Sequence, residues 1–514
     1  MNRRLLAAAL AAAFASQAGP AAAAMDLMDV IRAAAEIDPV VASSRAQLAA
    51  IQERVPQAQA TLKPTVNATA NGNFNILDTS VARTRDWDSQ SLGLLASVPV
   101  YRPANREVVR QSELSVQVAE AQLAQARQDL ILRVSQAYFD VLAAQDSLAV
   151  VRAQKQAIGE QFASARRNFE VGTATVTDQQ EAQARLDLTR AQEVSFENDL
   201  EVRRALLAQL IGKPAEDLHT LRRNVEVKAP EAEREGEWAS IARTQNHQVR
   251  QAEISGEIAR REIERQRFGH YPTLDLVTQA NAGRSTNAAT STAAVGIRSQ
   301  SALVGLQFAM PLYTGGAVDA RVREAIALQD KSQFDLENAR RVAEQAARQT
   351  FLGVKSGLEQ VRALTAAERS SQLALESNQL GYQVGVRINI DVLNAAQQLF
   401  STQRDLARAR YDVLLNGLRL RNTAGDLSES DVALVNALLE APRPPAPAAP
   451  AGSAPSGSTG SAPAASTPAT PGAATPAPGA PAGGTPGLAP PARPGIGGTP
   501  GVRGGRAAQP VSPR

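Results

Sequence analysis

The chain has 514 residues, a formal net charge of +3, no cysteine and an aromatic content of 4%. The lack of cysteine excludes disulfides, thiol chemistry and a lipid-modified amino-terminal cysteine, and the composition favours long helices over a conventional globular core. Acidic and basic residues are mixed through the sequence, so there is no basic patch of the kind that binds nucleic acid.

Residues 1–24 have the layout of a secretory signal peptide. Arg3 and Arg4 precede an apolar run from Leu5 to Ala15, and small residues end the segment at Ala24. A short membrane anchor is the alternative, but this run is shorter than the ~20 residues of a spanning helix. We therefore expect export, with a mature chain that begins near Met25.

Alternation of polar with small or apolar residues predicts two pairs of strands, at 62–76 with 90–101 and at 271–283 with 296–313. In the first strand Val66, Ala68 and Phe74 lie on one face and asparagines and threonines on the other. Each strand is close to the ~10 residues that cross a bilayer when tilted. We expect membrane-crossing strands, with the polar linkers 78–86 and 284–294 as surface loops.

Each strand pair is followed by a very long helix, a tight turn and a second long helix. Apolar residues at alternating spacings of three and four run from Leu130 to Phe169, with one lapse at Lys155, which is typical of a coiled coil. Gly172 and Gly385 offer left-handed caps at the two turns. Periodicity alone leaves open whether these helices form a tube wall or a solid rod.

The segment 441–514 consists largely of proline, alanine, glycine, serine and threonine. It cannot bury enough apolar surface to order itself, so we expect a disordered tail. A tether to a partner or to the cell wall is the alternative.

The two halves of the chain repeat each other in a frame of about 212 residues. SVPVYRP, which contains Tyr101, recurs as AMPLYTG, which contains Tyr313, and FEVGTATVTD recurs as YQVGVRINID. Chance similarity of alanine-rich helices would not keep prolines, glycines and aromatics in step. We therefore place a first repeat at 25–230 and a second repeat at 231–440.

The number of predicted strands requires an oligomer. The smallest closed membrane barrels use about eight strands, and an open sheet edge in lipid leaves backbone groups unpaired. Two copies of the four strands would give about eight, and three copies about twelve with a pore. This arithmetic does not choose between them.

With these motifs the chain resembles the TolC family of outer-membrane efflux and secretion channels. The resemblance covers roughly residues 26–439, and its most specific parts are VGTATVTD, GYQVGVRINIDVLNA, VPVY, MPLY and RDLARARYDVLLNGLRLRNTAGDLSESDV. It implies a mainly helical fold with membrane β-strands: a homotrimer with an α-helical barrel of long coiled-coil hairpins, a 12-stranded outer-membrane barrel and an equatorial region at 213–240 and 424–440. The missing amino-terminal cysteine makes it more similar to the type I secretion and multidrug branch than to the lipid-anchored branch.

The resemblance also implies a function. Such a protein is the outer-membrane exit duct of an efflux pump or secretion system, and substrates reach it from an inner-membrane transporter (ABC, RND or MFS type) through a periplasmic adaptor, or membrane fusion protein. Outer-membrane lipid surrounds its strands, and it needs no cofactor. The turns near Gly172 and Gly385 are the expected docking points for the adaptor.

The two turns differ where the resemblance implies a gate. Tyr382 and Arg387 stand where the first half has Phe169 and Ala174. The resemblance implies that the tyrosine and the arginine bond to Asp178 and hold the periplasmic entrance shut. The alternative is that they are ordinary polar residues at a helix end.

A constriction ring is implied just beyond the second turn. The family counterpart of Asp391 contributes to an acidic ring, which in a trimer favours cations and raises the cost of closure. A second aspartate of the family pattern is replaced by Asn394, so we expect a ring with half the charge. Asp391 also complements the dipole at a helix N-terminus.

Other classes of protein fit the sequence less well. His219, His247 and His270 have neither metal-ligand spacing nor a partnered nucleophile, so we expect no metal site and no catalytic site. A hydrolytic enzyme is therefore disfavoured. A periplasmic coiled-coil adaptor or scaffold is the main alternative, but it would need one hairpin and a soluble β-domain.

Overall fold

The computed structural model describes residues 24–80, 82–215, 217–222, 234–286 and 296–441. Most of the expected signal peptide, nearly all of the expected tail, the boundary between the repeats and most of the expected loop 284–294 lie outside these residues. The chain divides into two units, Met1–Ala446 and Pro447–Arg514. All of the described residues belong to the first unit.

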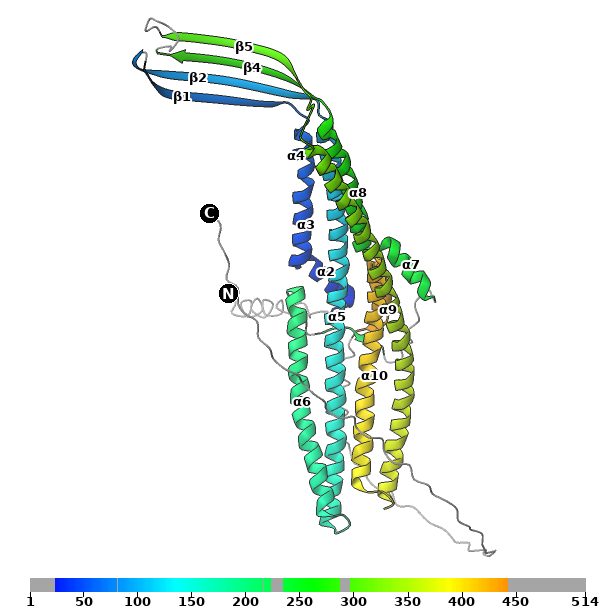
Figure 1. Ribbon diagram of the computed structural model, residues 1–514. Helices are drawn as coiled ribbons and strands as arrows, with labels where there is room; N and C mark the ends of the chain where they lie inside the picture. Colours follow the sequence, from blue (N-terminus) through cyan, green and yellow to red (C-terminus); the bar gives the residue numbers. More distant parts are fainter. Residues whose placement is uncertain (1–23, 81, 216, 223–233, 287–295, 442–514) are drawn as a thin grey trace, which may run out of the picture. The chain divides into compact units, whose positions relative to one another are not determined.

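The same order of elements occurs twice along the chain (Figure 1). The first half contains α2 (Leu27–Ile37), α3 (Pro39–Gln52), α4 (Arg54–Ala60), β1 (Thr65–Thr79), β2 (Ala82–Tyr101), α5 (Pro103–Glu170) and α6 (Val176–Ile211). The second half contains α7 (Glu235–Gln245), α8 (His247–Arg267), η2 (Phe268–His270), β4 (Thr273–Ser285), β5 (Ile297–Ala309), α9 (Ala317–Gln383) and α10 (Asn389–Ala424). The predicted duplication is confirmed at the level of element order.

Short elements complete the described chain. They are β3 (Thr220–Leu221), α11 (Glu429–Asn436) and β6 (Leu439–Glu440), and β3 pairs with β6. They border a core to which α2, α5, α6 and α10 contribute. Within it the hydroxyl of Tyr138, a fully buried residue, donates to the backbone oxygen of His219 at 2.8 Å.

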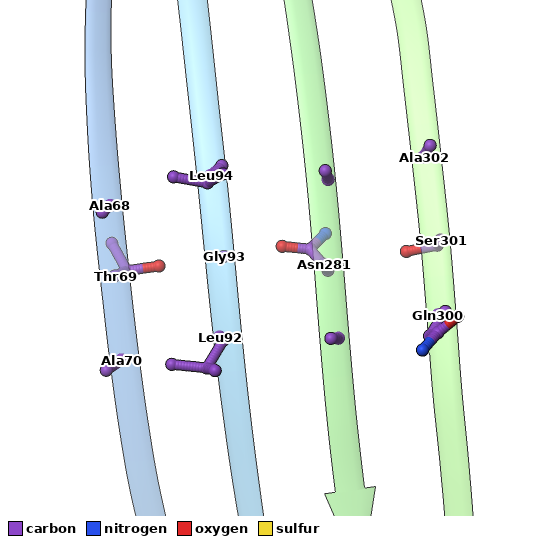
Figure 2. Close-up of a pocket in the computed structure, with 12 residues that line it drawn as sticks. Ala68, Thr69, Ala70, Leu92, Gly93, Leu94, Asn281, Gln300, Ser301 and Ala302 are labelled. Carbon is purple, nitrogen blue, oxygen red and sulfur yellow. The ribbon is translucent and has the colours of Figure 1, made fainter.

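The four long strands form one antiparallel sheet in the order β1-β2-β4-β5 (Figure 1). Ala70 pairs with Leu92, and Leu92 pairs with Ala282, so the apolar positions of neighbouring strands share a face. On the other face, Figure 2 shows Thr69 and Asn281 pointing toward Gly93. The predicted alternation of polar and apolar residues therefore gives the sheet one apolar face, to which strands from both halves of the chain contribute.

Most strand ends differ from the prediction by one to three residues, and two places differ by more. The segment 78–86 was expected to be a loop, but the ladder continues to Leu77↔Arg85 and Thr79↔Ala82, because backbone pairing does not require apolar side chains. β5 was expected to reach residue 313, but it ends at Ala309, which pairs with the first residue of β4. Beyond that point β4 offers β5 no further partner.

The long helices follow the predicted seam. α5 has 68 residues, and Val134, Val141 and Val151 on the seam are completely buried. The lapse at Lys155 is an ion pair with Glu193 of α6. Figure 1 shows α6 beside α5 and α10 beside α9, and each of these pairs packs together. In the part of the chain that the structure describes, no helix combines the length and the apolar character needed to cross a membrane.

Candidate functional site

The predicted gate residues all lie within or next to the two hairpin turns. α5 ends at Glu170 and α9 at Gln383, and each is followed by a glycine with positive φ, 80° at Gly172 and 77° at Gly385. The amide of Thr173 donates to the carbonyl of Asn168 at 2.8 Å, and the amide of Val386 donates to the carbonyl of Gly381 at 2.9 Å. The predicted left-handed glycine caps are confirmed.

The helices that leave the two turns begin differently. Before α6, the hydroxyl of Thr175 accepts from the amide of Asp178 at 3.2 Å, and the carboxylate of Asp178 accepts from the amide of Thr175 at 3.1 Å. This is a reciprocal capping box. Before α10 the equivalent residue is Ile388, which has no side-chain oxygen and makes no cap.

The absence of that cap leaves the carboxylate of Asp391 available to another partner. The guanidinium of Arg387 lies 3.7 Å from it, and both side chains are partly exposed. A Cβ atom placed on Gly381 would come within 2.7 Å of the Cγ atom of Arg387. Glycine at this position therefore makes room for the stem of the arginine, whereas the first turn has an asparagine there and an alanine in place of the arginine.

Tyr382 links the second turn to the first. Its hydroxyl accepts from the side-chain amide of Asn168 in α5 at 3.3 Å. Its ring packs against an apolar cluster of α9 and α10 that contains Leu375 and Val392. The two turns therefore lie side by side.

Asn389 makes a second link, which sequence reasoning missed. This residue is completely buried. Its amide nitrogen donates to the backbone carbonyl of Asp178 at 3.1 Å, and its carbonyl accepts from Gln161 at 2.5 Å. One side chain of α10 thus holds both α5 and α6. The available signal was a polar residue between Ile388 and Ile390 where the first half has Val176.

Asn394 lies one turn further along α10 and faces α6. Its side-chain oxygen accepts from Arg185 at 3.2 Å, and the same guanidinium donates to Gln397 at 2.6 Å. An arginine of the first hairpin therefore binds the position where the resemblance implies a second aspartate.

The structure brings the predicted gate residues to the same pair of turns without joining them directly. Among the described residues, the carboxylate of Asp178 bonds to Thr175, while Tyr382 bonds to Asn168 and Arg387 pairs with Asp391. The gate formed by Asp178, Tyr382 and Arg387 stays a prediction, as does the ring at Asp391.

A second polar region lies between α5, α6 and α10, at a cavity of about 320 Å³. Arg203 pairs there with Asp140 at 3.3 Å, and the hydroxyl of Tyr411 donates to Asp146 at 2.6 Å. Burial raises the pKa of both Asp140 and Asp146. Within the described ranges, no three histidine, aspartate or glutamate side chains are grouped to hold a metal ion.

Comparisons with known proteins give a consistent result. The family model described as outer membrane efflux protein matches residues 30–213 and 238–426. Outer membrane protein TolC of Vibrio cholerae is 34% identical over 81% of this chain and 94% of its own length. Proteases secretion protein PrtF of Dickeya chrysanthemi is 30% identical over 83% and 94%, and alkaline protease secretion protein AprF of Pseudomonas aeruginosa is 31% identical over 70% and 75%.

Solved structures share the fold. The outer membrane protein VceC of Vibrio cholerae matches with a TM-score of 0.65 and 18% identity over 78% of this chain and 96% of its own. The outer membrane channel CmeC of Campylobacter jejuni matches with a TM-score of 0.67 and 16% identity over 80% and 89%.

Proposed function

The chain belongs to the family of outer membrane efflux proteins, which are non-enzymatic outer-membrane exit ducts for efflux and secretion, and we propose that three copies of it close into one such duct. Channels of this type work with adaptors and inner-membrane transporters. We propose that this chain forms a trimer and that its partners are a periplasmic adaptor and an inner-membrane transporter.

The observation that carries assembly into a closed barrel is the open, apolar sheet. Large side chains on one face are bare, with Val66 68%, Leu92 65% and Leu306 69% exposed, and in the described chain β1 and β5 are the two edges. Unpaired strand edges in lipid cost several kcal/mol for each backbone group, roughly. Because the strands alternate in direction, β5 of one copy is antiparallel to β1 of the next, and three copies give about twelve strands around a pore.

The proposed periplasmic end is the pair of turns at Gly172 and Gly385. We assign the docking of the adaptor to these exposed turns and place the transporter, of ABC, RND or MFS type, behind it. PrtF and AprF are named for protease secretion, which makes an exported protein the first cargo to test. We further propose that residues 1–24 are a signal peptide, that the repeats occupy 25–230 and 231–440, and that 441–514 is a disordered tail.

The proposed gate uses the polar contacts between the turns. Tyr382 bonds to the first hairpin, Arg387 is exposed at the second turn, and the backbone carbonyl of Asp178 accepts from the buried Asn389. Partly exposed ion pairs contribute about 0.2 to 1 kcal/mol each. Threefold repetition gives a bias of a few kcal/mol, roughly, which an engaged adaptor or transporter can overcome.

Single-channel conductance in planar bilayers tests this function. We expect a small conductance for the wild type and a severalfold larger one for Tyr382→Phe with Arg387→Ser. Arg362→Ser is the matched control, because it removes an exposed ion pair within α9, with Glu359, away from the turns. A wild-type pore that the double variant leaves unchanged would discard these gate residues, and inserted trimers without conductance would overturn the duct.

A further inference from the structure

Within the sheet the two repeats meet once, at the pairing of β2 with β4, and this junction is a template for the junction between copies. If the duct is an oligomer, as proposed above, the end of the second repeat meets the start of the first repeat of the next copy. That places β5 beside β1 of the neighbouring copy.

The sequence repeat gives the pairing register between β5 and β1 of the next copy, because each residue of the β2–β4 pairing has an equivalent in or just after β5, or in β1. Lys63-Pro64-Thr65-Val66-Asn67 corresponds to Tyr271-Pro272-Thr273-Leu274-Asp275, and Tyr101 corresponds to Tyr313. Within the chain Leu95 pairs with Gln279, and Gly93 pairs with Asn281. We propose that in the assembled duct Gln307 pairs with Asn71 of the neighbouring copy and Gly305 pairs with Asn73 of the neighbouring copy.

The different ends of β2 and β5 indicate that β5 pairs with a strand of another copy. Tyr101 pairs with Leu274 and is 37% exposed, whereas Tyr313 is 90% exposed. β2 reaches Tyr101 because β4 lies beside it, and β5 stops four residues earlier than that equivalent position. In the proposed register Val66 of the next copy lies opposite Tyr313 and supplies the missing partner.

Two equivalent glycines are consistent with this pairing. A Cβ atom on Gly93 would lie 2.8 Å from the side-chain oxygens of both Asn281 and Thr69 (Figure 2), so a larger residue would have to displace the asparagine that lies over this position. Gly305 has nothing within 4 Å, and a glycine within a strand costs stability. The proposed register places Asn73 of the neighbouring copy over Gly305 as Asn281 lies over Gly93.

The faces of the sheet agree with this pairing. Phe308, Leu306 and Val304 come opposite Ala70, Gly72 and Phe74 of the neighbour, so both apolar faces point the same way. A slip of one residue would reverse the faces. A slip of two would keep them and bring Asn71 or Asn75 opposite Gly305, so the repeat alone decides between these registers.

The junction between copies also lacks an ion pair that the internal junction has. Arg102, just after β2, holds Asp275 with two hydrogen bonds, of 2.8 Å and 2.7 Å. The equivalent residues at the seam are Thr314 and Asn67 of the neighbour, both uncharged. Around the duct, junctions with this ion pair, between β2 and β4, therefore alternate with junctions without it, between β5 and β1 of the next copy.

Site-directed crosslinking tests the register, because the chain contains no native cysteine. The double variant Gln307→Cys with Asn71→Cys is treated in outer membranes with a short thiol-to-thiol crosslinker. The slipped pairs combine Gln307→Cys with Thr69→Cys or with Asn73→Cys. The internal pair Leu95→Cys with Gln279→Cys is the geometric control, since its crosslink forms within one chain.

We expect the matched pair to join copies severalfold faster than either slipped pair. A slipped pair that reacts faster would overturn the register, and a retained conductance would show that the duct itself stands. If the internal control reacts and none of the three seam pairs joins copies, the edge-to-edge junction is wrong.

Discussion

At the scale of single residues, Asn389 is the contact that joins the two hairpins most directly. It is fully buried, and its two hydrogen bonds reach α5 through Gln161 and α6 through Asp178. A buried amide that loses its partner costs about 1–3 kcal/mol. The position therefore has more energetic weight than the exposed pair of Arg387 with Asp391.

Asn389→Ala is expected to loosen the closed arrangement of the turns. The substitution removes both bonds and leaves the amide of Gln161 unpaired, so single-channel conductance should rise at least as much as in the variant of Tyr382 and Arg387. Asn378→Ala is the control, because Asn378 is half-buried and its hydrogen bond, to the carbonyl of Ala374, lies within its own helix. An unchanged conductance in Asn389→Ala would remove this residue from the gate.

Asp146 predicts a pH dependence of stability. Burial raises its pKa above the ordinary 3.8, although the hydroxyl of Tyr411 and the charge of Arg410 act in the opposite direction. The folded chain therefore holds this proton more tightly than the unfolded chain, and the free energy of unfolding falls as pH rises from 3.8 through the raised pKa.

Asp146→Asn should remove this contribution to the slope, and Asp140 contributes in the same direction because its pKa is raised as well. Tyr411→Phe should steepen the slope, since it removes the bond that stabilises the carboxylate. Denaturant unfolding followed by circular dichroism over a pH series measures both variants. Equal slopes in wild type and Asp146→Asn would contradict the assignment.

At the scale of elements, the two turns share their backbone and differ in their caps. Gly172 and Gly385 end α5 and α9 alike, but Thr175 caps α6 while Ile388 leaves α10 uncapped. Because α10 has no side-chain cap, the carboxylate of Asp391 is available to pair with Arg387 in the second turn.

Ile388→Thr is expected to restore the capping box and to draw Asp391 away from Arg387. The start of α10 should gain about 1 kcal/mol, while conductance should rise because the arginine loses its partner. Adding Arg387→Ser to this background should then change conductance little. Ile388→Val keeps the branched shape without the hydroxyl, and a rise in that control would assign the effect to packing instead.

The sequence predicts these elements to different degrees. The seam through Val134 and Val151, the glycine caps and the alternating strand faces follow from local periodicity, so they were predictable. The link at Asn389 was missed because its partners, Gln161 and Asp178, lie on another hairpin. The end of β5 at Ala309 was missed because its extent depends on what lies beyond the edge of the sheet.

At the scale of the whole molecule, duplication makes one internal junction in the sheet and requires one external junction. The internal one has the ion pair of Arg102 with Asp275, whose carboxylate is nearly buried. The external one has Thr314 and Asn67 instead. Assembly between copies therefore depends more on strand pairing and apolar contact than the internal junction does.

Installing the missing ion pair should strengthen the assembly. Asn67→Asp together with Thr314→Arg places the internal pair at the seam, where it should contribute about 1 kcal/mol per interface after screening by solvent. Asn67→Asp alone leaves a carboxylate without its cation, and Thr314→Arg alone leaves a cation without its carboxylate, so neither single variant should gain stability. The temperature at which detergent-solubilised oligomers dissociate, read from native gels across this double-mutant cycle, should rise only in the double variant. Additive effects of the two substitutions would mean that residues 67 and 314 do not meet, and the junction between copies would then not follow the internal template.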